Sequence, residues 1–364
     1  MKSHIQSISI EGFKSIRQLQ HFPLNPGLNV LIGANGAGKS NFVELLKLLE
    51  MWALNGLNEY VTQMGGAESF LFQGAETTGK IEIGLDLSGQ SCNGYQFSFA
   101  RTVENKFMET TTTPFYPGPH SFNQAFPIGG DPWAAKDQAD AFLNETMKGW
   151  QVYSFQNTTA FSPLRRDASI YNNIEFMFDG SNLPSFLLKI QTSFNEVYSK
   201  IRMALAMVMP VFDDFVLTPI ENPTVNDRLV RLCWRQKGSR YLFQPWQMSD
   251  GTLRFLALTI ALLQPNPPAV IAIDEPELGL HPESLTTLAG FMHEAAFRSQ
   301  LIVTTQSPDL LNTMEPEDVV TVNMRNGESV FNRLSRADLA NWLEDYAIGD
   351  LWWKKVIQAG PAYV

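Results

Sequence analysis

The sequence predicts an α/β fold with a mixed, largely parallel sheet at its core, and three patterns support this. Near the N-terminus a continuous apolar segment, "GLNVLIG", precedes a glycine-rich turn and an amphipathic helix. Towards the C-terminus strand and helix patterns alternate, as in "PAVIAID", "PESLTTLAGFMHEAA" and "QLIVTTQ", which indicates parallel strands with helices on their faces. Between them, "KIEIGLDL" and "GYQFSFARTV" alternate strictly and predict half-buried antiparallel strands.

The N-terminal elements follow in a clear order. Ile8, Ile10 and Phe13 alternate with polar neighbours and predict a first strand, and residues 27–33 form the buried strand. Apolar residues then recur at helical spacing from Phe42 to Trp52. An α/β unit therefore begins within the first fifty residues.

The middle of the chain differs from both ends. Residues 106–133 are rich in Thr, Pro, Gly and Phe and predict a loop-rich excursion. Next come a short helix over 134–147, a strand "WQVYSF" and a helical stretch over 183–208; the segments "FDDFVLTPI", "RLVRLCWRQ" and "YLFQPW" predict further strands. We interpret 1–364 as one domain, in which 1–105 and 265–364 form the α/β lobe with an antiparallel β subdomain and 106–264 an inserted, partly helical lobe.

Composition limits the class of protein. With 44% hydrophobic and 18% charged residues, the chain can bury a sizeable core. The net charge of −10 opposes general binding to nucleic acid or anionic lipid, although it leaves a local basic groove open. The two cysteines, Cys92 and Cys233, form no disulfide framework, and "LRFLALTIALL" is about half the length of a membrane span. We expect a soluble, cytoplasmic protein without a membrane partner.

One motif predicts a phosphate site. "GANGAGKS" matches G-x-x-x-x-G-K-[ST] at every fixed position, after a buried strand and before a helix. Its glycines let backbone N–H groups surround phosphates, Lys39 would reach the β- and γ-phosphates, and Ser40 would ligate Mg²⁺. The predicted ATP-binding residues here are Gly33, Ala34, Asn35, Gly36, Ala37, Gly38, Lys39, Ser40 and Asn41. The α/β lobe is thus predicted to be a P-loop nucleotide-binding lobe.

A second motif supplies two carboxylates. In "AVIAIDEPELGLHP" an apolar strand ends in Asp274, at the edge of a parallel sheet where ligands bind. Asp274 would hold Mg²⁺ through its water shell, and Glu275 would act as the general base that polarises the attacking water. Two adjacent acids at a buried strand end favour a nearby cation over a purely structural role.

The third motif, "MSDGT", opens an apolar helix. By itself, Ser249-Asp250-Gly251 could be simply a helix cap, with Ser249 or Asp250 accepting N–H bonds. Together with the P-loop and the Asp-Glu strand, it resembles the ATP-binding-cassette ATPases, whose signature loop (Leu-Ser-Gly-Gly-Gln in transporters) lies one helix before the Asp-Glu strand. The resemblance implies that Ser249, Asp250 and Gly251 contact the γ-phosphate held by another subunit, in a head-to-tail homodimer with two ATP molecules between the protomers. Asp250 stands where transporters have glycine, and a carboxylate there should repel the γ-phosphate unless it caps the helix and faces away.

The same resemblance assigns two glutamines. Gln156, after the strand "WQVYSF", is similar to the Q-loop glutamine that reaches Mg²⁺ and the attacking water. Gln306, after "LIVTT", occupies the place of the family's switch histidine, and it can hydrogen-bond a γ-phosphate but cannot become cationic. His281 falls in the stretch that crosses the dimer seam in such ATPases; a helix-start role is the alternative.

Within that superfamily, "SIEGFKSIRQL", "SDGTLRFLAL" and "TTQSPDLL" resemble the compact RecF/SMC-like ATPases of bacteria, related to OLD-family ATPase domains. This resemblance implies an ATP-driven switch in anti-phage defence or genome maintenance, acting on a separately encoded effector such as a nuclease. The first alternative is a repair ATPase of RecF type that binds DNA directly. A basic groove for it would draw on Lys14, Arg17, Lys189, Lys200 and Arg202. A transporter motor subunit is the less favoured alternative.

Two pairs of adjacent charged residues belong to none of these motifs. Asp213-Asp214 could be a metal pair, but a helix-to-strand turn is favoured. Arg165-Arg166 could meet DNA or phosphate, but a solvated loop is favoured.

Overall fold

The computed structural model describes residues 3–88, 94–115, 143, 145–222 and 227–357. The chain divides into two compact units. The first unit comprises Met1–Val152, Pro268–Asp274 and Ala296–Val364, and the second comprises Tyr153–Pro267 and Glu275–Ala295. The first unit extends beyond the predicted boundary near residue 105, because its strand pairing continues through residue 115. Residues 275–295, which we predicted to lie in the α/β lobe, belong to the second unit.

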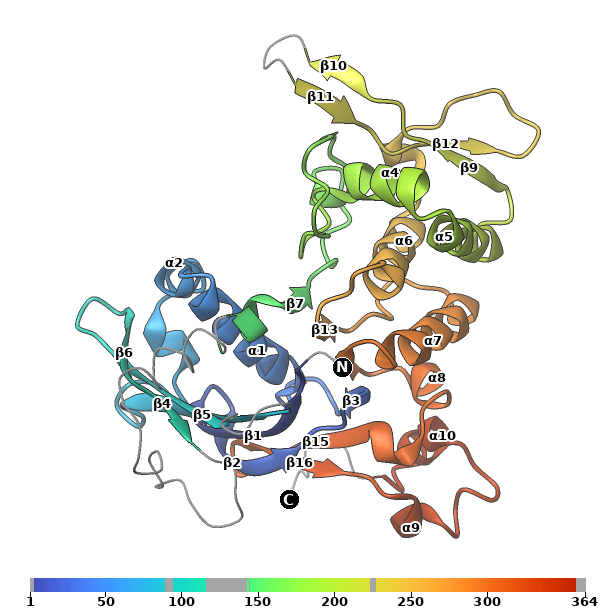
Figure 1. Cartoon of the computed structure of the whole chain (residues 1–364). Helices are drawn as coiled ribbons and strands as arrows, with labels where there is room; N and C mark the ends of the chain where they lie inside the picture. The colour runs from blue at the N-terminus through green and yellow to red at the C-terminus, as the bar shows by residue number, and fades with distance from the viewer. Residues whose placement is uncertain (1–2, 89–93, 116–142, 144, 223–226, 358–364) are drawn as a thin grey trace. The chain divides into compact units, whose positions relative to one another are not determined.

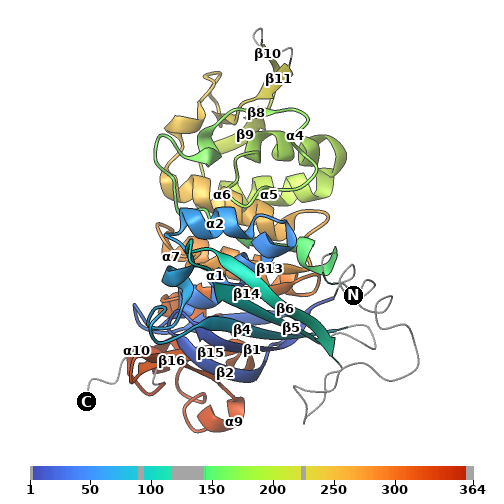
Figure 2. The same ribbon diagram turned by 90° about the vertical axis from the view of Figure 1, so that its left-hand side faces the viewer.

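The first unit contains an antiparallel sheet in the order β2-β1-β4-β5-β6 (Figure 2). Its strands are β1 (Ile5–Phe13), β2 (Ile16–Pro23), β4 (Lys80–Leu87), β5 (Gly94–Arg101) and β6 (Phe107–Phe115). The strictly alternating segments predicted for β4 and β5 pair with each other, with Ile81 opposite Phe99 and Ile83 opposite Phe97. One face of this sheet supplies these apolar side chains to the core.

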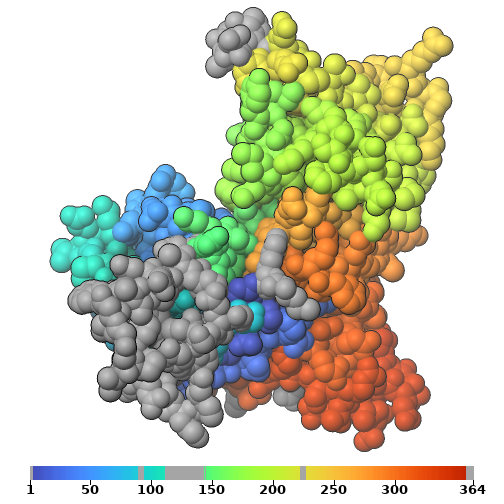
Figure 3. Space-filling model, in the orientation of Figure 1, coloured from blue at the N-terminus to red at the C-terminus, as the bar shows by residue number. Residues whose placement is uncertain are grey.

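The first unit also contains the predicted mixed sheet, in the order β16-β15-β3-β14-β13-β7. Its strands are β3 (Leu28–Ile32), β7 (Trp150–Tyr153), β13 (Val270–Asp274), β14 (Gln300–Thr305), β15 (Val319–Arg325) and β16 (Glu328–Arg333). The strands β15, β3, β14 and β13 run parallel, and β16 is antiparallel to β15. Segments from the two ends of the sequence, coloured blue and orange-red, therefore lie side by side in this unit (Figures 1 and 3).

Helix α1 (Lys39–Ala53) fills the core of the first unit. Its apolar residues, among them Phe42, Leu45 and Leu49, are buried in one cluster with side chains from both sheets. This unit also contains the helices α2 (Leu57–Gln63), α8 (Pro308–Leu311), α9 (Arg336–Leu339) and α10 (Ile348–Trp353), and residues 145–148 are helical as well. Most of the predicted helix over 134–147 lies outside the described residues.

The second unit combines helices with short antiparallel strands (Figure 1). Its helices are α4 (Leu183–Ser193), α5 (Asn195–Val208), α6 (Asp250–Leu263) and α7 (Pro282–Ala296), and α5 packs on α6. One sheet has the order β10-β11-β8 and the other pairs β12 with β9. These strands are β8 (Ala168–Ser169), β9 (Phe212–Val216), β10 (Ile220–Asn222), β11 (Asp227–Val230) and β12 (Cys233–Gln236).

Two predictions for the second unit were wrong in detail. The helical stretch over 183–208 is two helices, because Phe194 leaves helical geometry with φ −140° and ψ 63°. The segment "YLFQPW" forms one isolated bridge, Trp234 with Phe243, and then the short 3-10 helix Pro245–Gln247. Pro245 lacks the N–H that a continuing strand would donate. Across the described residues, no helix is long and apolar enough to span a membrane.

Candidate nucleotide site

The glycine-rich loop follows β3 directly and leads into α1, as predicted. Gly36 and Gly38 have φ of +77° and +102°, a region that residues with a Cβ rarely adopt. A Cβ on Gly33 would lie 2.2 Å from the carbonyl oxygen of Val322 in β15, and one on Gly38 would lie 2.0 Å from the Ser329 Oγ in β16. Glycine is therefore required here by loop conformation and by close packing against the sheet.

Two serines outside the motif support the loop. The Ser329 Oγ donates to the carbonyl of Ala37 (2.7 Å) and lies 2.6 Å from the Ser15 Oγ. The Asn41 amide donates to the Ser15 Oγ (2.6 Å). Ser15 comes from the turn between β1 and β2, so the antiparallel sheet also helps to fix the loop. Nothing in the glycine-rich motif predicts a role for Ser329. Ser15 lies in "GFKSI", which is part of the segment that resembles RecF/SMC-like ATPases.

The lysine of the motif lies inside the loop, and its serine contacts the carboxylate of the second motif. Lys39 is 4% exposed, and its Nζ donates to the carbonyls of Gly33 (2.8 Å) and Ala34 (3.2 Å), so the ammonium lies within the loop. The Ser40 hydroxyl donates to Asp274 Oδ1 at 3.0 Å. Two of the three residues predicted to contact Mg²⁺, Ser40 and Asp274, are thus in contact although they are 234 positions apart in the chain.

Sheet topology explains this contact. Asp274 ends β13 in register with Thr304 of β14, and Thr305 is in register with Ile32, the last residue of β3. The carboxyl ends of these parallel strands form one edge, which carries the P-loop and Asp274. Thr304 Oγ1 also donates to Asp274 Oδ1 and orients the carboxylate. Gln306 is the first residue after β14 and so belongs to the same edge.

These residues fit Mg²⁺ bound together with phosphates. A hydroxyl and one carboxylate are oxygen donors, and Mg²⁺ in nucleotide sites takes one or two protein ligands besides phosphate oxygens and water. Among the described residues, no group of three or more His, Cys, Asp and Glu side chains gathers into a metal site of another kind. Asp213 and Asp214 lie within β9 and not in the helix-to-strand turn that we expected. Asp214 accepts a hydrogen bond from the Tyr198 hydroxyl (2.6 Å), which favours a structural role over a metal pair.

Glu275 opens the part of the second unit that contains α7. Its φ is +46°, in the left-handed region that non-glycine residues seldom occupy. Its carbonyl accepts from the Arg254 guanidinium (2.9 Å) and from the N–H of Leu278 (3.3 Å). Arg254 lies within α6 and is 6% exposed. In the sequence it is the single charged residue of the apolar run "LRFLALTIALL", which is what could have pointed to a buried role. We did not single it out from the sequence.

The motif "MSDGT", residues 248–252, is called the signature segment below, and it leads into α6 in the second unit. Ser249 is the N-cap, and its Oγ accepts from the N–H of Thr252 (3.2 Å), so the capping role is present. A Cβ on Gly251 would lie 2.3 Å from the carbonyl oxygen of Gly279. The helix start is therefore packed against the loop that follows Glu275.

Asp250 and Arg165 form an ion pair, with 2.5 Å between Arg165 Nη2 and Asp250 Oδ1. The Arg165 side chain is only 7% exposed. Our expectation of a solvated loop at Arg165-Arg166 was therefore wrong for Arg165, because its guanidinium finds acceptors on the signature segment. Arg166 is exposed.

Gln156 and His281 are both exposed, and their positions do not discriminate between the roles considered for them. Gln156 lies three residues after the end of β7 and is exposed. His281 is exposed directly before α7, and its Nδ1 lies 3.4 Å from the N–H of Glu283, as in the helix-start alternative. The roles assigned to both residues stay predictions.

The basic residues considered for a DNA groove are largely engaged within the chain. Lys14 pairs with Glu44 and Lys200 with Glu294. In addition, Lys189 Nζ donates to the carbonyl of Asn173, and Arg202 lies 3.8 Å from Asp214. The ion pairs offset positive charge that Lys14, Lys200 and Arg202 could offer to phosphates, whereas the hydrogen bond of Lys189 leaves its charge in place.

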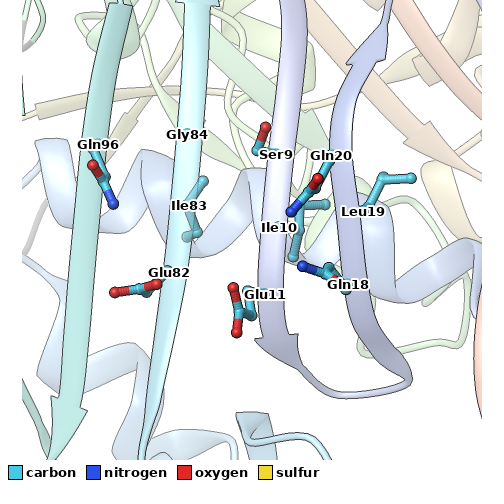
Figure 4. A pocket seen from close by; sticks show the side chains of 10 residues that line it. All are labelled: Ser9, Ile10, Glu11, Gln18, Leu19, Gln20, Glu82, Ile83, Gly84 and Gln96. Carbon is cyan, nitrogen blue, oxygen red and sulfur yellow. The ribbon is translucent and has the colours of Figure 1, made fainter. Parts of the chain in front are cut away.

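A separate hollow of about 300 Å³ lies on the antiparallel sheet (Figure 4). Glu11 of β1 and Glu82 of β4, which are register partners, face it with several glutamines. Two neighbouring carboxylates disfavour a phosphate ligand, so this hollow is a poor candidate for nucleotide binding.

Comparisons with known proteins agree with this geometry. The family model described as "AAA domain, putative AbiEii toxin, Type IV TA system" matches residues 28–312. The DNA replication and repair protein RecF of Renibacterium salmoninarum is 35% identical over 89 residues, 23% of this chain and 21% of that protein. The chromosome partition protein Smc of Rhodopirellula baltica is 29% identical over 75 residues, 21% of this chain and 6% of that protein. Urease accessory protein 2 of Cryptococcus neoformans var. grubii is 31% identical over 94 residues, 25% of this chain and 7% of that protein. The aligned parts thus span about a fifth or less of these relatives.

Solved structures share the fold at low sequence identity. An Smc head bound to the C-winged helix domain of ScpA has a TM-score of 0.62 at 16% identity, covering 92% of this chain and 99% of that one. An Smc head of Pyrococcus furiosus, bound to the C-terminal domain of ScpA, has a TM-score of 0.58 at 15% identity, covering 94% and 99%. The predicted α/β P-loop fold is confirmed. The chain belongs to the family described as AAA domain, putative AbiEii toxin, Type IV TA system, and it is a compact RecF/SMC-like ATPase.

Proposed function

We propose that this chain binds ATP with Mg²⁺ and hydrolyses it as a head-to-tail homodimer, whose closing and opening is sensed by a partner protein. The observation that carries the proposal is the 3.0 Å contact between Ser40 and Asp274, at the sheet edge that also carries the glycine-rich loop. A hydroxyl and a carboxylate meeting beside a buried lysine form the protein half of a magnesium–phosphate site.

Each residue has a separate task in this proposal. Backbone N–H groups of residues 33–41 and the Lys39 ammonium bind and orient the phosphates, while Ser40 and Asp274 hold Mg²⁺. The bound ion would neutralise charge that develops on the transferred phosphoryl group. Glu275 accepts a proton from the attacking water, and Gln156 and Gln306 position that water and the γ-phosphate. Ser249 contacts the γ-phosphate held by the second copy.

The switch role is supported by what the described residues contain. The proposed nucleotide site rests on these residues, and among the described residues no group of three or more His, Cys, Asp and Glu side chains could hold a metal ion. A chain that cycles between ATP-bound and free states, without a second reaction of its own, would act through a separately encoded effector. The Smc head found bound to a domain of ScpA is a precedent for a relative that binds a partner, and defence or genome maintenance are settings for such a pair.

Two variants test the hydrolytic cycle. Lys39→Ala should abolish ATP binding, because the ammonium inside the loop is lost. Glu275→Gln should bind ATP normally yet hydrolyse it about 10²- to 10⁴-fold more slowly, since a general base is removed. It should also accumulate as an ATP-bound dimer, seen by light scattering after size exclusion.

Glu283→Gln, which makes the same chemical change at an exposed residue of α7, is the matched control and should hydrolyse ATP at the wild-type rate. Hydrolysis by Glu275→Gln at that rate would refute the base assignment. A Glu275→Gln protein that binds ATP but stays monomeric would refute the dimer.

A further inference from the structure

Asp250 poses an electrostatic problem for the proposed function. Its side chain is 66% exposed at the first residue of α6, next to the N-cap Ser249. A carboxylate is favourable at a helix N-terminus. It repels a phosphate in the same place, however, and the proposed function puts the γ-phosphate of the partner copy beside Ser249.

The Arg165 guanidinium meets this carboxylate and three other acceptors. Its Nη2 donates to Asp250, and its Nη1 donates to the carbonyls of Pro245 and of Met248 (3.1 Å). On the other side, its Nε donates to the carbonyl of Thr158 (3.2 Å). One nearly buried side chain thus joins the signature segment to the residues that follow Gln156.

The segment that carries Arg165 is itself closed by hydrogen bonds. The fully buried Ser162 donates its hydroxyl to the carbonyl of Asn157 and accepts from the N–H of Leu164 (3.2 Å). Asn157 is the residue after Gln156. A compact, hydrogen-bonded turn therefore connects Gln156 to Arg165, whose guanidinium contacts the start of α6.

We infer that Arg165 is a positioning residue with two effects, which rest on the proposed function. It neutralises Asp250, so that the Ser249 end of α6 can accept the γ-phosphate of the partner copy. It also couples the segment after Gln156 to the signature segment, so that the two parts of the site adjust together. The planar guanidinium suits both effects, because it can bind a carboxylate and carbonyls at once.

The test uses the Glu275→Gln protein as parent and measures ATP-dependent dimerisation by analytical ultracentrifugation. Adding Arg165→Ala should weaken dimerisation about 10- to 100-fold, because the Asp250 carboxylate then faces a phosphate across the interface without a neutralising partner. Binding of a fluorescent ATP analogue to the single protomer should not change. Arg166→Ala, which removes the exposed neighbouring arginine, is the matched control and should dimerise like the parent.

A second substitution separates charge from structure. Asp250→Asn in the Arg165→Ala background should restore much of the dimerisation, and the defect of Arg165→Ala alone should shrink at high salt, because screening weakens repulsion. A purely structural role predicts no rescue by Asp250→Asn and no salt effect. Asp250→Asn alone should dimerise more tightly than the parent at low salt, because the Arg165 charge is then no longer offset by Asp250. Unchanged dimerisation of this variant would contradict the charge effect even if Arg165→Ala does not fold.

The outcomes distinguish the two proposals. A parent that binds ATP but does not dimerise would overturn the proposed function and this inference together. If the parent dimerises and Arg165→Ala dimerises equally well, the inference alone is overturned. Failure of Asp250→Asn to restore dimerisation would overturn the neutralising role of Arg165.

Discussion

At the scale of the residue, Glu275 combines the chemistry of a base with an unfavourable backbone. Its φ of +46° persists because the Arg254 guanidinium and the N–H of Leu278 both donate to its carbonyl. Strained backbone conformations cluster at functional sites, where surrounding contacts hold them. The observation supports the role proposed for Glu275 independently of the Asp-Glu motif.

This strain leads to a prediction about stability. Glu275→Asn and Glu275→Gln both remove the carboxylate, but asparagine tolerates left-handed geometry better than glutamine. Glu275→Asn should therefore be more stable by up to about 1 kcal/mol, a fraction of the cost of such a conformation. Urea unfolding of the two variants measures the difference, and equal midpoints would argue against strain at this residue.

At the scale of the element, helix α6 is fixed at its start by close backbone packing. Gly251→Ala would place a methyl group 2.3 Å from the carbonyl oxygen of Gly279 and should destabilise the protein by about 1–3 kcal/mol, the usual cost of overpacking. The control is Gly290→Ala in α7, where a Cβ meets nothing within 4 Å. It should be neutral or stabilising by about 0.5–1 kcal/mol, because alanine favours helix. Thermal unfolding compares them, and equal losses would contradict the packing argument.

Helix α1 and strand β7 are joined by a buried carboxylate. Glu50 is 4% exposed; it pairs with Lys47 and accepts from the Gln151 amide (3.1 Å). Burial raises the pKa of Glu50 above its ordinary value of 4.5, although Lys47 and the N–H of Val152 act in the opposite direction. The link anchors the strand that leads towards Gln156.

The raised pKa of Glu50 predicts how stability varies with pH. The folded protein holds this proton more tightly than the unfolded chain, so the unfolding free energy falls as pH rises from about 4.5 through the raised pKa. Glu50→Gln should remove that part of the decline, whereas Glu76→Gln, at an exposed position, should not. Urea unfolding at several pH values tests this, and an unchanged pH profile in Glu50→Gln would exclude the effect.

At the scale of the whole molecule, the proposed active site needs two chains. Ser249→Arg should leave ATP binding by one protomer intact but prevent closure, whereas Lys39→Ala should lose ATP binding. A mixture of the two inactive variants should regain ATPase activity, because one intact P-loop then meets one intact signature segment in a mixed dimer. The steady-state rate of the mixture measures this, and a mixture as inactive as its components would contradict a head-to-tail site.

The sequence by itself determined the parts of the molecule that depend on local patterns. The apolar strand, glycine-rich loop and helix around Gly33–Ser40, the strand ending at Asp274 and helix α7 all lie where periodicity and motif spacing predicted them. Even the meeting of Ser40 and Asp274 was foreseeable, because the carboxyl ends of parallel strands share one edge. The predicted mixed sheet and antiparallel sheet follow from the same patterns.

Only the tertiary structure decided which side chains from distant segments meet. No periodicity connects Arg165 with Asp250, Ser329 with Ala37 or Arg254 with the carbonyl of Glu275, since each pair is joined by packing of separate elements. The break between α4 and α5 at Phe194 likewise could not be predicted, because no glycine or proline marks it in the sequence. Motifs therefore identified the groups that are proposed to bind and hydrolyse ATP. The tertiary structure showed the hydrogen bonds that hold those groups in place.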